Sequence, residues 1–325
     1  MSNNITNLLA RLCLSSAESL SYRQRKRLEY EFSSAEEILS SFSSVFIDYI
    51  GEKSYMELSK IKALGLERLY DEITSSGIKL CLLGDSDYPY LLSNIQDPPD
   101  LLYYFGCLPK NDDRLISIVG SRRETAYGRK QAFSISKELA ENACTVVSGL
   151  AYGIDSAAHK GALEARGKTI AVLGSGLKNI YPKDNIPLAR EIAEKGGAII
   201  SEFPPLSEPL SFHFPIRNRI VSGLSSAVLL IEAREKSGTM ITINHALNQG
   251  REVFALPGPV DVSSSVLTNR LIREGARCIT SANDILVDMG WAEKEISARQ
   301  TSLVSLNLTK IQQKIYYALS QESLS

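Results

Sequence analysis

The sequence lacks a strong charge of either sign. Its 36 Lys and Arg residues nearly balance its 37 Asp and Glu residues, so the formal net charge is −1. A global positive field, which would announce a nucleic-acid partner, is therefore absent. Any site for an anion must be a local cluster of cations.

Long hydrophobic runs and paired cysteines are also missing. The longest apolar runs, such as residues 227–231, are too short to span a bilayer. The N-terminus, MSNNITNLLARLCL, lacks the basic start and long apolar core of a secretion signal. The five cysteines are scattered and never form a C-x-x-C pair. We therefore expect a cytoplasmic protein, without a membrane partner, whose thiols are reduced and mostly buried.

Metal-ligand clusters and catalytic constellations are scarce. His159, His213 and His245 are too few and too dispersed to suggest a zinc site. We find no carboxylate pair at hydrolase-like spacing, no G-x-S-x-G elbow and no Cys/His couple. GKT at 167–169 fails as a P-loop, because Ala162 stands where Gly is needed and because a strand follows it instead of preceding it. We expect no cofactor, no metal and no enzymatic activity.

What the sequence does contain is a strand–helix rhythm. Most of its apolar runs are continuous, as in strands covered on both faces, and helical patterns separate them. This alternation predicts an α/β fold with an extended Rossmann-like, doubly wound, mostly parallel sheet. The predicted strands are 115–119, 144–147, 169–173, 198–201, 227–233, 252–256 and 277–280.

The two ends of the chain lack this strand–helix alternation. Residues 1–75 show short apolar repeats between Ser-rich breaks, which predicts a small all-helical module before a sheet domain at 78–290. Residues 291–325 comprise a polar link and one amphipathic segment, LTKIQQKIYYALS. A single helix cannot bury a core alone.

The informative turns follow the predicted strands. In a doubly wound sheet, ligands bind beyond the carboxyl ends of the strands. Here those ends run into the turns GSRRETAYG, SGLAYGID, GSG, EFPP, REKSGT and PGP. Glycine lets a backbone pass close to a ligand, and free N–H groups at helix starts attract anions. We predict a phosphate-facing rim formed by Gly120, Ser121, Ser148, Gly149 and Gly153.

Positive charges converge on the same edge. Arg122 follows the first turn, Lys183 lies in the YPKDN loop, and Arg217 and Arg219 belong to FPIRNRIVSG. Several cations from separate loops suit a polyanion whose phosphates recur along a strand.

Aromatic residues lie beside these arginines. Phe212 and Phe214 end the segment PPLSEPLSFHF, which contains too much Pro and Ser to belong to the core. Unpaired bases stack on exposed rings, so we predict that one of these two rings meets a base.

Two alternatives stay open at these positions. In the first alternative, Arg217 or Arg219 pairs with Glu202 or Glu232 and holds the loop, since Arg is the preferred partner of buried carboxylates. In the second, Asp155, at the start of a helix, is only an N-terminal cap.

Together these motifs resemble the DNA-processing protein A (DprA/Smf) family over about residues 80–290. The motifs are IVGSR, SGLAYGIDSAAHKGAL, AVLGSG…YP, SEFPP, FPIRNRIVSGLS, EAREKSGTMIT and LPGP…LIREGA. The resemblance implies single-stranded DNA binding, protection of incoming DNA during natural transformation and transfer to the RecA recombinase. It also implies a homodimer with contacts at about 266–285, and a SAM- or helix-hairpin-helix-like module at 1–75. The family's DNA contacts fall on Arg122, Lys183, Arg217 and Arg219, and its phosphate rim on Gly120, Ser121, Ser148, Gly149 and Gly153.

The sequence departs from this family at three places. Tyr152 replaces the usual Arg of SGLARGID, and Leu267 replaces a usual Gly. Residues 291–325 match only the beginning of the winged-helix domain in which many members end, so we expect a truncated one.

An enzyme is the alternative class. Rossmann nucleoside-monophosphate phosphoribohydrolases share such a sheet and read PGG-x-GT, with a Glu shortly after. Here SGT at 237–239 is followed by MITIN, without the acid. That difference favours binding over catalysis.

Overall fold

The computed structural model describes residues 2–292. Most of the predicted C-terminal segment, 291–325, lies outside the described residues. The chain up to Ile285 forms one compact unit, and the residues from Leu286 onward are assigned to a second one.

The first part of the chain is helical, as its apolar repeats indicate. The helices are α1 (Ser2–Ser16), α2 (Tyr22–Glu31), α3 (Ala35–Ser40), α4 (Ile47–Leu64) and α5 (Leu66–Thr74), with a 3-10 turn η1 (Ser44–Phe46). Ser21 starts α2 with a capping box, because its side chain accepts from the backbone of Gln24 while the Gln24 side chain accepts from the Ser21 backbone. Leu12 and Ile73 share an apolar cluster with Tyr103 of the sheet. The helical segment therefore contributes to the core of the sheet, and its limits as a separate module stay a prediction.

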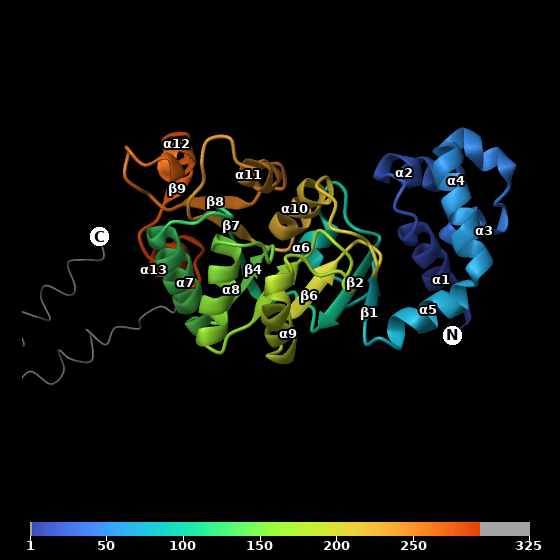
Figure 1. Ribbon diagram of the computed structural model, residues 1–325, viewed down its shortest axis with the longest axis horizontal. Coiled ribbons are helices and arrows are strands. Elements are labelled where there is room, and N and C mark those ends of the chain that lie inside the picture. The colour runs from blue at the N-terminus through green and yellow to red at the C-terminus, as the bar shows by residue number, and fades with distance from the viewer. Residues whose placement is uncertain (1, 293–325) are drawn as a thin grey trace, which may run out of the picture. The chain divides into compact units, whose positions relative to one another are not determined.

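A nine-stranded sheet forms the centre of the described chain (Figure 1). Its spatial order is β1-β2-β6-β5-β4-β3-β7-β8-β9. The strands are β1 (Lys79–Leu82), β2 (Leu101–Gly106), β3 (Arg114–Val119), β4 (Cys144–Ser148), β5 (Thr169–Val172), β6 (Ala198–Ser201), β7 (Ala227–Leu230), β8 (Glu252–Ala255) and β9 (Arg277–Cys278). β2 runs antiparallel to both β1 and β6, and the other neighbouring pairs are parallel. The predicted doubly wound, mostly parallel sheet is confirmed.

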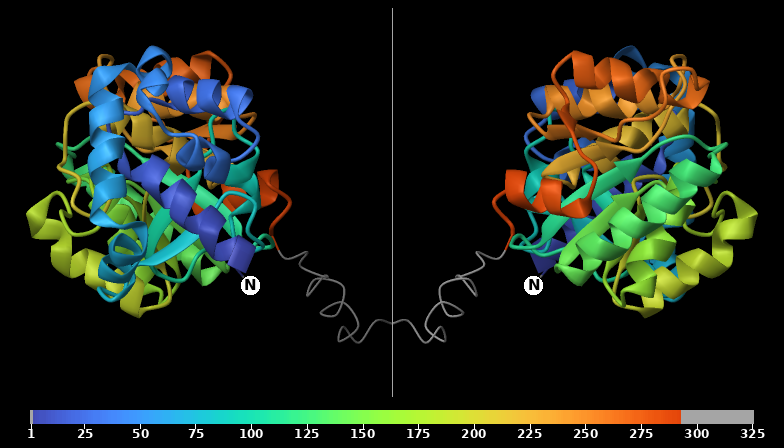
Figure 2. Two further views of the ribbon diagram at one scale, coloured as in Figure 1. Left: turned by 90° about the vertical axis from the view of Figure 1, so that its right-hand side faces the viewer. Right: turned by 90° about the vertical axis from the view of Figure 1, so that its left-hand side faces the viewer.

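Helices cover both faces of the sheet. The helices of this part are α6 (Tyr90–Ser93), α7 (Ala126–Glu141), α8 (Ile154–Glu164), α9 (Ile186–Glu194), α10 (His213–Gly223), α11 (Thr239–Asn248), α12 (Val266–Arg273) and α13 (Ala282–Asp288). The 3-10 turns η2 (Lys183–Asn185) and η3 (Ser263–Ser265) precede α9 and α12. In Figure 2 the orange helices α11 and α12 lie above the sheet and the green helices α7 and α8 lie below it. Strands enclosed in this way are buried along both faces, which explains their continuous apolar sequences.

The strand order places a topological switch point between β3 and β7. From β3 the chain builds β4, β5 and β6 outward in one direction, and from β7 it builds β8 and β9 in the other. The connections leave these two strands on opposite sides, which opens a crevice beyond their carboxyl ends.

The environment of Leu267 and the lengths of the helices bear on two further expectations. Leu267, the departure from the family's Gly, is fully buried in the core at the start of α12, and its N–H donates to Ala233 O. Within residues 2–292 no helix combines the length and apolarity needed to cross a membrane.

Candidate nucleic-acid interface

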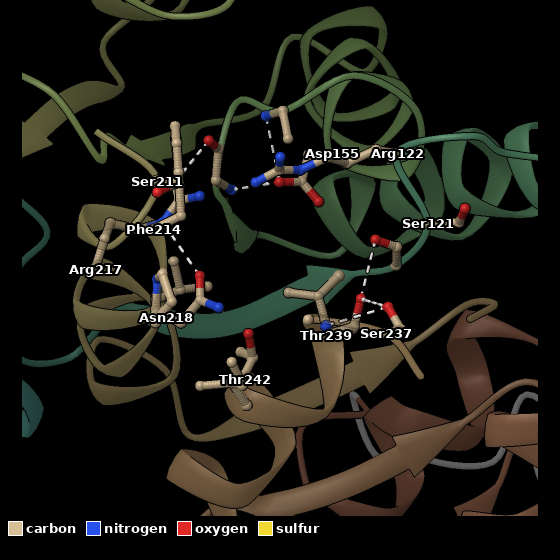
Figure 3. Close-up of a pocket in the computed structure, with 18 of the residues that line it drawn as sticks. Ser121, Arg122, Asp155, Ser211, Phe214, Arg217, Asn218, Ser237, Thr239 and Thr242 are labelled. Carbon is tan, nitrogen blue, oxygen red and sulfur yellow. Dashed lines mark hydrogen bonds between the residues drawn. The ribbon is translucent and has the colours of Figure 1, made fainter. Parts of the chain in front are cut away.

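A cavity of about 770 Å³ lies at the switch point. Its walls are the β3–α7 loop, the β4–α8 loop with the start of α8, residues of the β5–α9 and β6–α10 loops, α10, and the β7–α11 loop with the start of α11. Figure 3 labels side chains from the β3–α7 loop, α8, the β6–α10 loop, α10, and the β7–α11 loop with α11 around the same space.

Glycine brings two of these loops into contact. Gly153 has φ +81°, and a Cβ at this position would overlap the carbonyl oxygen of Ser121. The backbone N–H of Ile154 donates to that same oxygen at 3.1 Å. The sequence needs glycine here because only glycine adopts this φ without strain and leaves room for the neighbouring backbone.

Two of the five predicted rim residues use their amides inside the protein. The N–H of Ser121 donates to Glu232 O at 2.9 Å, and the N–H groups of Gly149 and Ala151 donate to Asp155 Oδ2 at 3.1 and 3.3 Å. The Asp155 carboxylate thus accepts two amides of the β4–α8 loop, and a backbone carbonyl accepts that of Ser121. None of the three amides is available to a ligand while these bonds are formed.

The other rim residues divide between the wall and its support. Gly120, Ser121 and Gly149 line the cavity. Ser148 is fully buried, and its hydroxyl donates to Ile118 O at 2.7 Å. Ser148 and Gly153 therefore shape the loops and do not line the cavity.

Arg217 is a fixed, buried cation in the wall. It is 4% exposed, and its NH1 group donates to the carbonyl oxygens of Gly149, at 2.6 Å, and Val172. Burial lowers the pKa of this guanidinium to about 10, so it stays charged at neutral pH. Asp155 offsets part of that cost, while burial raises the pKa of the Asp155 carboxyl against the opposing effect of Arg217.

Phe214 lies between two of the arginines. Its ring centroid is 4.9 Å from the guanidinium carbon of Arg122 and 6.0 Å from that of Arg217. The ring of Tyr181 is 5.9 Å away from Phe214, tilted by 52°. Phe214 and Tyr181 both line the cavity, whereas Phe212 does not, although its side chain is exposed.

Arg219 has a different role from the one predicted. It is 6% exposed and lies outside the cavity lining. Its guanidinium donates to both carboxylate oxygens of Glu202, each at 2.7 Å, and to Asp97 at 2.8 Å. The ion-pair alternative therefore describes Arg219, with Glu202 as one of its partners.

Lys183 is exposed at the start of η2 and lies outside the cavity lining. Its contact with DNA stays a prediction. The loop to which it belongs is bound to the β4–α8 loop, since the Asn185 side chain donates to Leu150 O and to the Ser156 hydroxyl, both at 2.8 Å.

We expected the REKSGT turn at this edge of the sheet but did not select its two cations as anion contacts. Arg234, Lys236 and the SGT segment 237–239 follow β7, directly across the switch point from Arg122. Thr239 Oγ1 donates to Gly120 O at 3.2 Å and so ties this wall to the first. Its signal was present in EAREKSGT, a Gly-containing turn with two cations after a strand.

The lining carries an excess of positive charge. Of the described residues that line it, Asp155 is the one acid, and its Oδ2 is already an acceptor for two amides. The lining cations are Arg122, Arg123, Arg217, Arg234 and Lys236. No cluster of three or more His, Cys, Asp or Glu side chains suited to a metal ion occurs in the part of the chain that the structure describes.

Fold and site together define a Rossmann-like α/β protein with a cation-lined, aromatic-bearing crevice at its switch point. The family model for DNA recombination-mediator protein A matches residues 79–290, and the chain belongs to that family.

Individual relatives agree with this assignment. The chain is 40% identical to DNA processing protein DprA of Bacillus subtilis over 225 residues, which is 69% of this chain and 75% of that one. It is 44% identical to protein Smf of Escherichia coli over 202 residues, 62% of this chain and only 54% of that relative.

Two solved structures are similar as well. The X-ray structure of DNA processing protein A from Streptococcus pneumoniae aligns with a TM-score of 0.73 and 35% identity, covering 85% of this chain and 96% of that one. The Helicobacter pylori DNA processing protein A, described for its single-stranded DNA binding mode, aligns with a TM-score of 0.58 and 30% identity. That alignment covers 65% of this chain and 95% of the other.

Proposed function

We propose that this protein binds single-stranded DNA in the switch-point cavity and acts as a non-catalytic mediator of recombination. The observation that carries the proposal is the lining itself, with five cations, one engaged acid and two adjacent rings. The single-stranded DNA binding described for the Helicobacter pylori relative supports it.

We propose different tasks for the side chains that line the cavity. Arg122, Arg123, Arg234 and Lys236 contact phosphates from opposite walls, while Arg217 supplies a fixed positive charge between them. Phe214 offers its ring to a base. Phosphate contacts and stacking do not read base edges, so the binding tolerates most sequences.

Binding, and not base release, is the activity that the lining supports. The SGT turn is followed by Met240, Ile241 and Thr242, which carry no acid. A phosphoribohydrolase would need a carboxylate free to assist the reaction, whereas Asp155 accepts the amides of Gly149 and Ala151.

Membership of the family extends the proposal to partners. We propose that the protein works in the cytoplasm, protects incoming single strands and passes them to RecA. It does so as a homodimer with contacts at about 266–285, where α12 and the edge strand β9 lie. Light scattering across a concentration series tests the dimer, and RecA filament formation on DNA coated with a single-strand-binding protein tests the transfer.

The first experiment measures binding of a labelled 30–40-nucleotide single strand, against duplex of equal length, across a salt series. For single strands, each phosphate that the protein neutralises adds roughly 0.7 to the steepness of log affinity against log salt. We expect wild type to prefer the single strand, and Arg122→Ala to bind about tenfold more weakly at low salt with a slope shallower by roughly 0.7.

Arg68→Ala serves as the matched control. Arg68 is 75% exposed and pairs with Glu72 within α5, away from the cavity, so this substitution should leave the slope unchanged. Absence of single-strand binding by wild type at low salt would rule out the proposed function.

A further inference from the structure

Beside the cavity, the β4–α8 loop is connected to the segment around η2, and it carries an additional exposed ring, that of Tyr152. Ala151 lines the cavity, and the next residue, Tyr152, is 43% exposed. Tyr152 lies outside the lining, at the point where the β4–α8 loop turns into α8. It takes no part in the site described so far.

A hydrogen bond holds this ring in place. The Tyr152 hydroxyl donates to Asp184 Oδ2 at 2.7 Å. This bond raises the pKa of the hydroxyl, so it remains a protonated donor at neutral pH. A side chain tied at its tip loses less freedom when a ligand stacks on it than a free side chain would.

The same bond connects Tyr152 to the loop that carries Tyr181. Asp184 is three residues after Tyr181, which lines the cavity with its ring 5.9 Å from that of Phe214. Tyr181 is also 43% exposed, and it is close enough to Tyr152 to contribute to the raised pKa of the Tyr152 hydroxyl. Phe214 and Tyr181 thus line the cavity, and Tyr152 lies outside the lining on a loop bound to that of Tyr181.

An exposed cation accompanies the outer ring. Lys183 lies between Tyr181 and Asp184 in sequence and is exposed. A ring for a base beside a cation for a phosphate is the combination by which proteins hold single strands without reading their sequence. Lys183 does not line the cavity, and in this arrangement it is the cation that contacts the phosphate.

We propose that Tyr152 and Lys183 form an outer subsite, in which a base of the strand leaving the cavity stacks on Tyr152 and its phosphate contacts Lys183. This inference rests on the proposed function, because the ligand is the same single strand. It adds a contact outside the cavity and makes part of the affinity depend on bases.

The test compares two ligands of equal charge. One is a labelled oligothymidine of 30 nucleotides, and the other is the same backbone with tetrahydrofuran abasic sites throughout. Tyr152→Ala should bind oligothymidine about tenfold more weakly than wild type, since stacking on one ring contributes that order of affinity. Its affinity for the abasic strand should stay within about twofold of wild type, with the same salt slope on both.

Two further variants distinguish the effect of the Tyr152 ring from that of its hydrogen bond, and from the effect of removing any exposed tyrosine. Tyr152→Phe keeps the ring and removes the bond to Asp184, so it should stay within about threefold of wild type. Tyr127→Ala is the matched control, because Tyr127 is 44% exposed, donates its hydroxyl to Pro257 O at 3.1 Å and does not line the cavity. It should bind both strands as wild type does.

Each contrary result has a distinct meaning. Wild-type affinity in Tyr152→Ala, or an equal reduction on both strands, would overturn the outer subsite and leave the cavity proposal standing. A reduction in Tyr152→Phe as large as that in Tyr152→Ala would overturn it too, because the bond and not the ring would then matter. If wild type binds neither strand at low salt, both proposals fail.

Discussion

At the scale of single residues, Asp155 is the unusual member of the site. Its carboxylate is buried, accepts two backbone amides and is the one acid among the described lining residues, whose other charged side chains are cations. Its bonds to Gly149 and Ala151 hold the β4–α8 loop in shape. In the proposed complex its negative charge would oppose a phosphate in the cavity.

Replacing Asp155 with Asn should tighten single-strand binding and destabilise the fold. The amide oxygen of Asn still accepts the N–H groups of Gly149 and Ala151, but the charge is gone, and we expect affinity at low salt to rise about threefold or more. The buried charge of Arg217 is then without its compensating anion, so the melting temperature should fall.

Asp113→Asn is the control for this substitution. Asp113 also accepts a backbone amide, that of Lys110, at 2.9 Å. It directly precedes β3, at the amino-terminal end of the strand, whereas the cavity lies beyond the carboxyl end. Its neutralisation should leave affinity nearly unchanged. Weaker binding by the Asp155 variant, with its fold intact, would show that the carboxylate assists the ligand.

The two arginines of FPIRNRI show what a sequence can and cannot reveal at this scale. The segment is part of α10, where residues two positions apart point to nearly opposite sides of the helix. Arg217 consequently faces the cavity, and Arg219 faces Asp97 and Glu202. The sequence predicted that both were important, but the partner of each depended on segments more than fifteen residues away.

At the scale of elements, the β7–α11 loop is the wall whose two cations, Arg234 and Lys236, the sequence analysis did not select. The strands themselves were predictable because continuous apolar runs mark them. Their spatial order was not, because the neighbours of a strand depend on packing across the whole sheet. Without the adjacency of β3 and β7, nothing in EAREKSGT showed that it faces Arg122 across the crevice.

The double variant Arg234→Ala with Lys236→Ala tests this wall. If both side chains contact phosphates, the log–log salt slope should become shallower by roughly 1.4, twice the value for one phosphate. Both residues are exposed, so the melting temperature should stay close to that of wild type.

A double variant with the same charge change controls for net charge. Lys137 and Lys195 each lie on a helix or at its end and pair with a Glu one turn away, outside the cavity. Replacing both with Ala should leave the slope close to that of wild type. Equal slopes for the two double variants would remove the β7–α11 loop from the interface.

At the scale of the whole molecule, one buried histidine makes the stability of the fold depend on pH. His159 on α8 is fully buried, and its Nδ1 lies 2.7 Å from Thr169 Oγ1. The Thr169 hydroxyl donates to Val146 O, so it accepts from His159, and the proton of the neutral ring is on Nδ1. The other nitrogen, Nε2, has no hydrogen-bond partner in the described structure.

Protonation of that nitrogen would place an unpaired charge in the core. Burial, helped by the positive charge of Arg217, lowers the pKa of His159 to about 3, from an ordinary value of 6.5. The unfolded chain therefore takes up the proton first as the pH falls. The contribution of His159 to stability is complete above about pH 6.5 and is lost progressively as the pH falls from there towards 3.

Denaturant unfolding at a series of pH values measures this contribution. Below pH 6.5, His159 should lower the free energy of unfolding by up to about 1.4 kcal/mol per pH unit. His159→Gln cannot titrate, and its amide can still donate to Thr169, so its profile should lack this component. The stability advantage of wild type over the variant should then shrink steadily between pH 6.5 and pH 4. A constant difference over that range would mean that His159 is already protonated in the folded state or is reached by water, contrary to its burial.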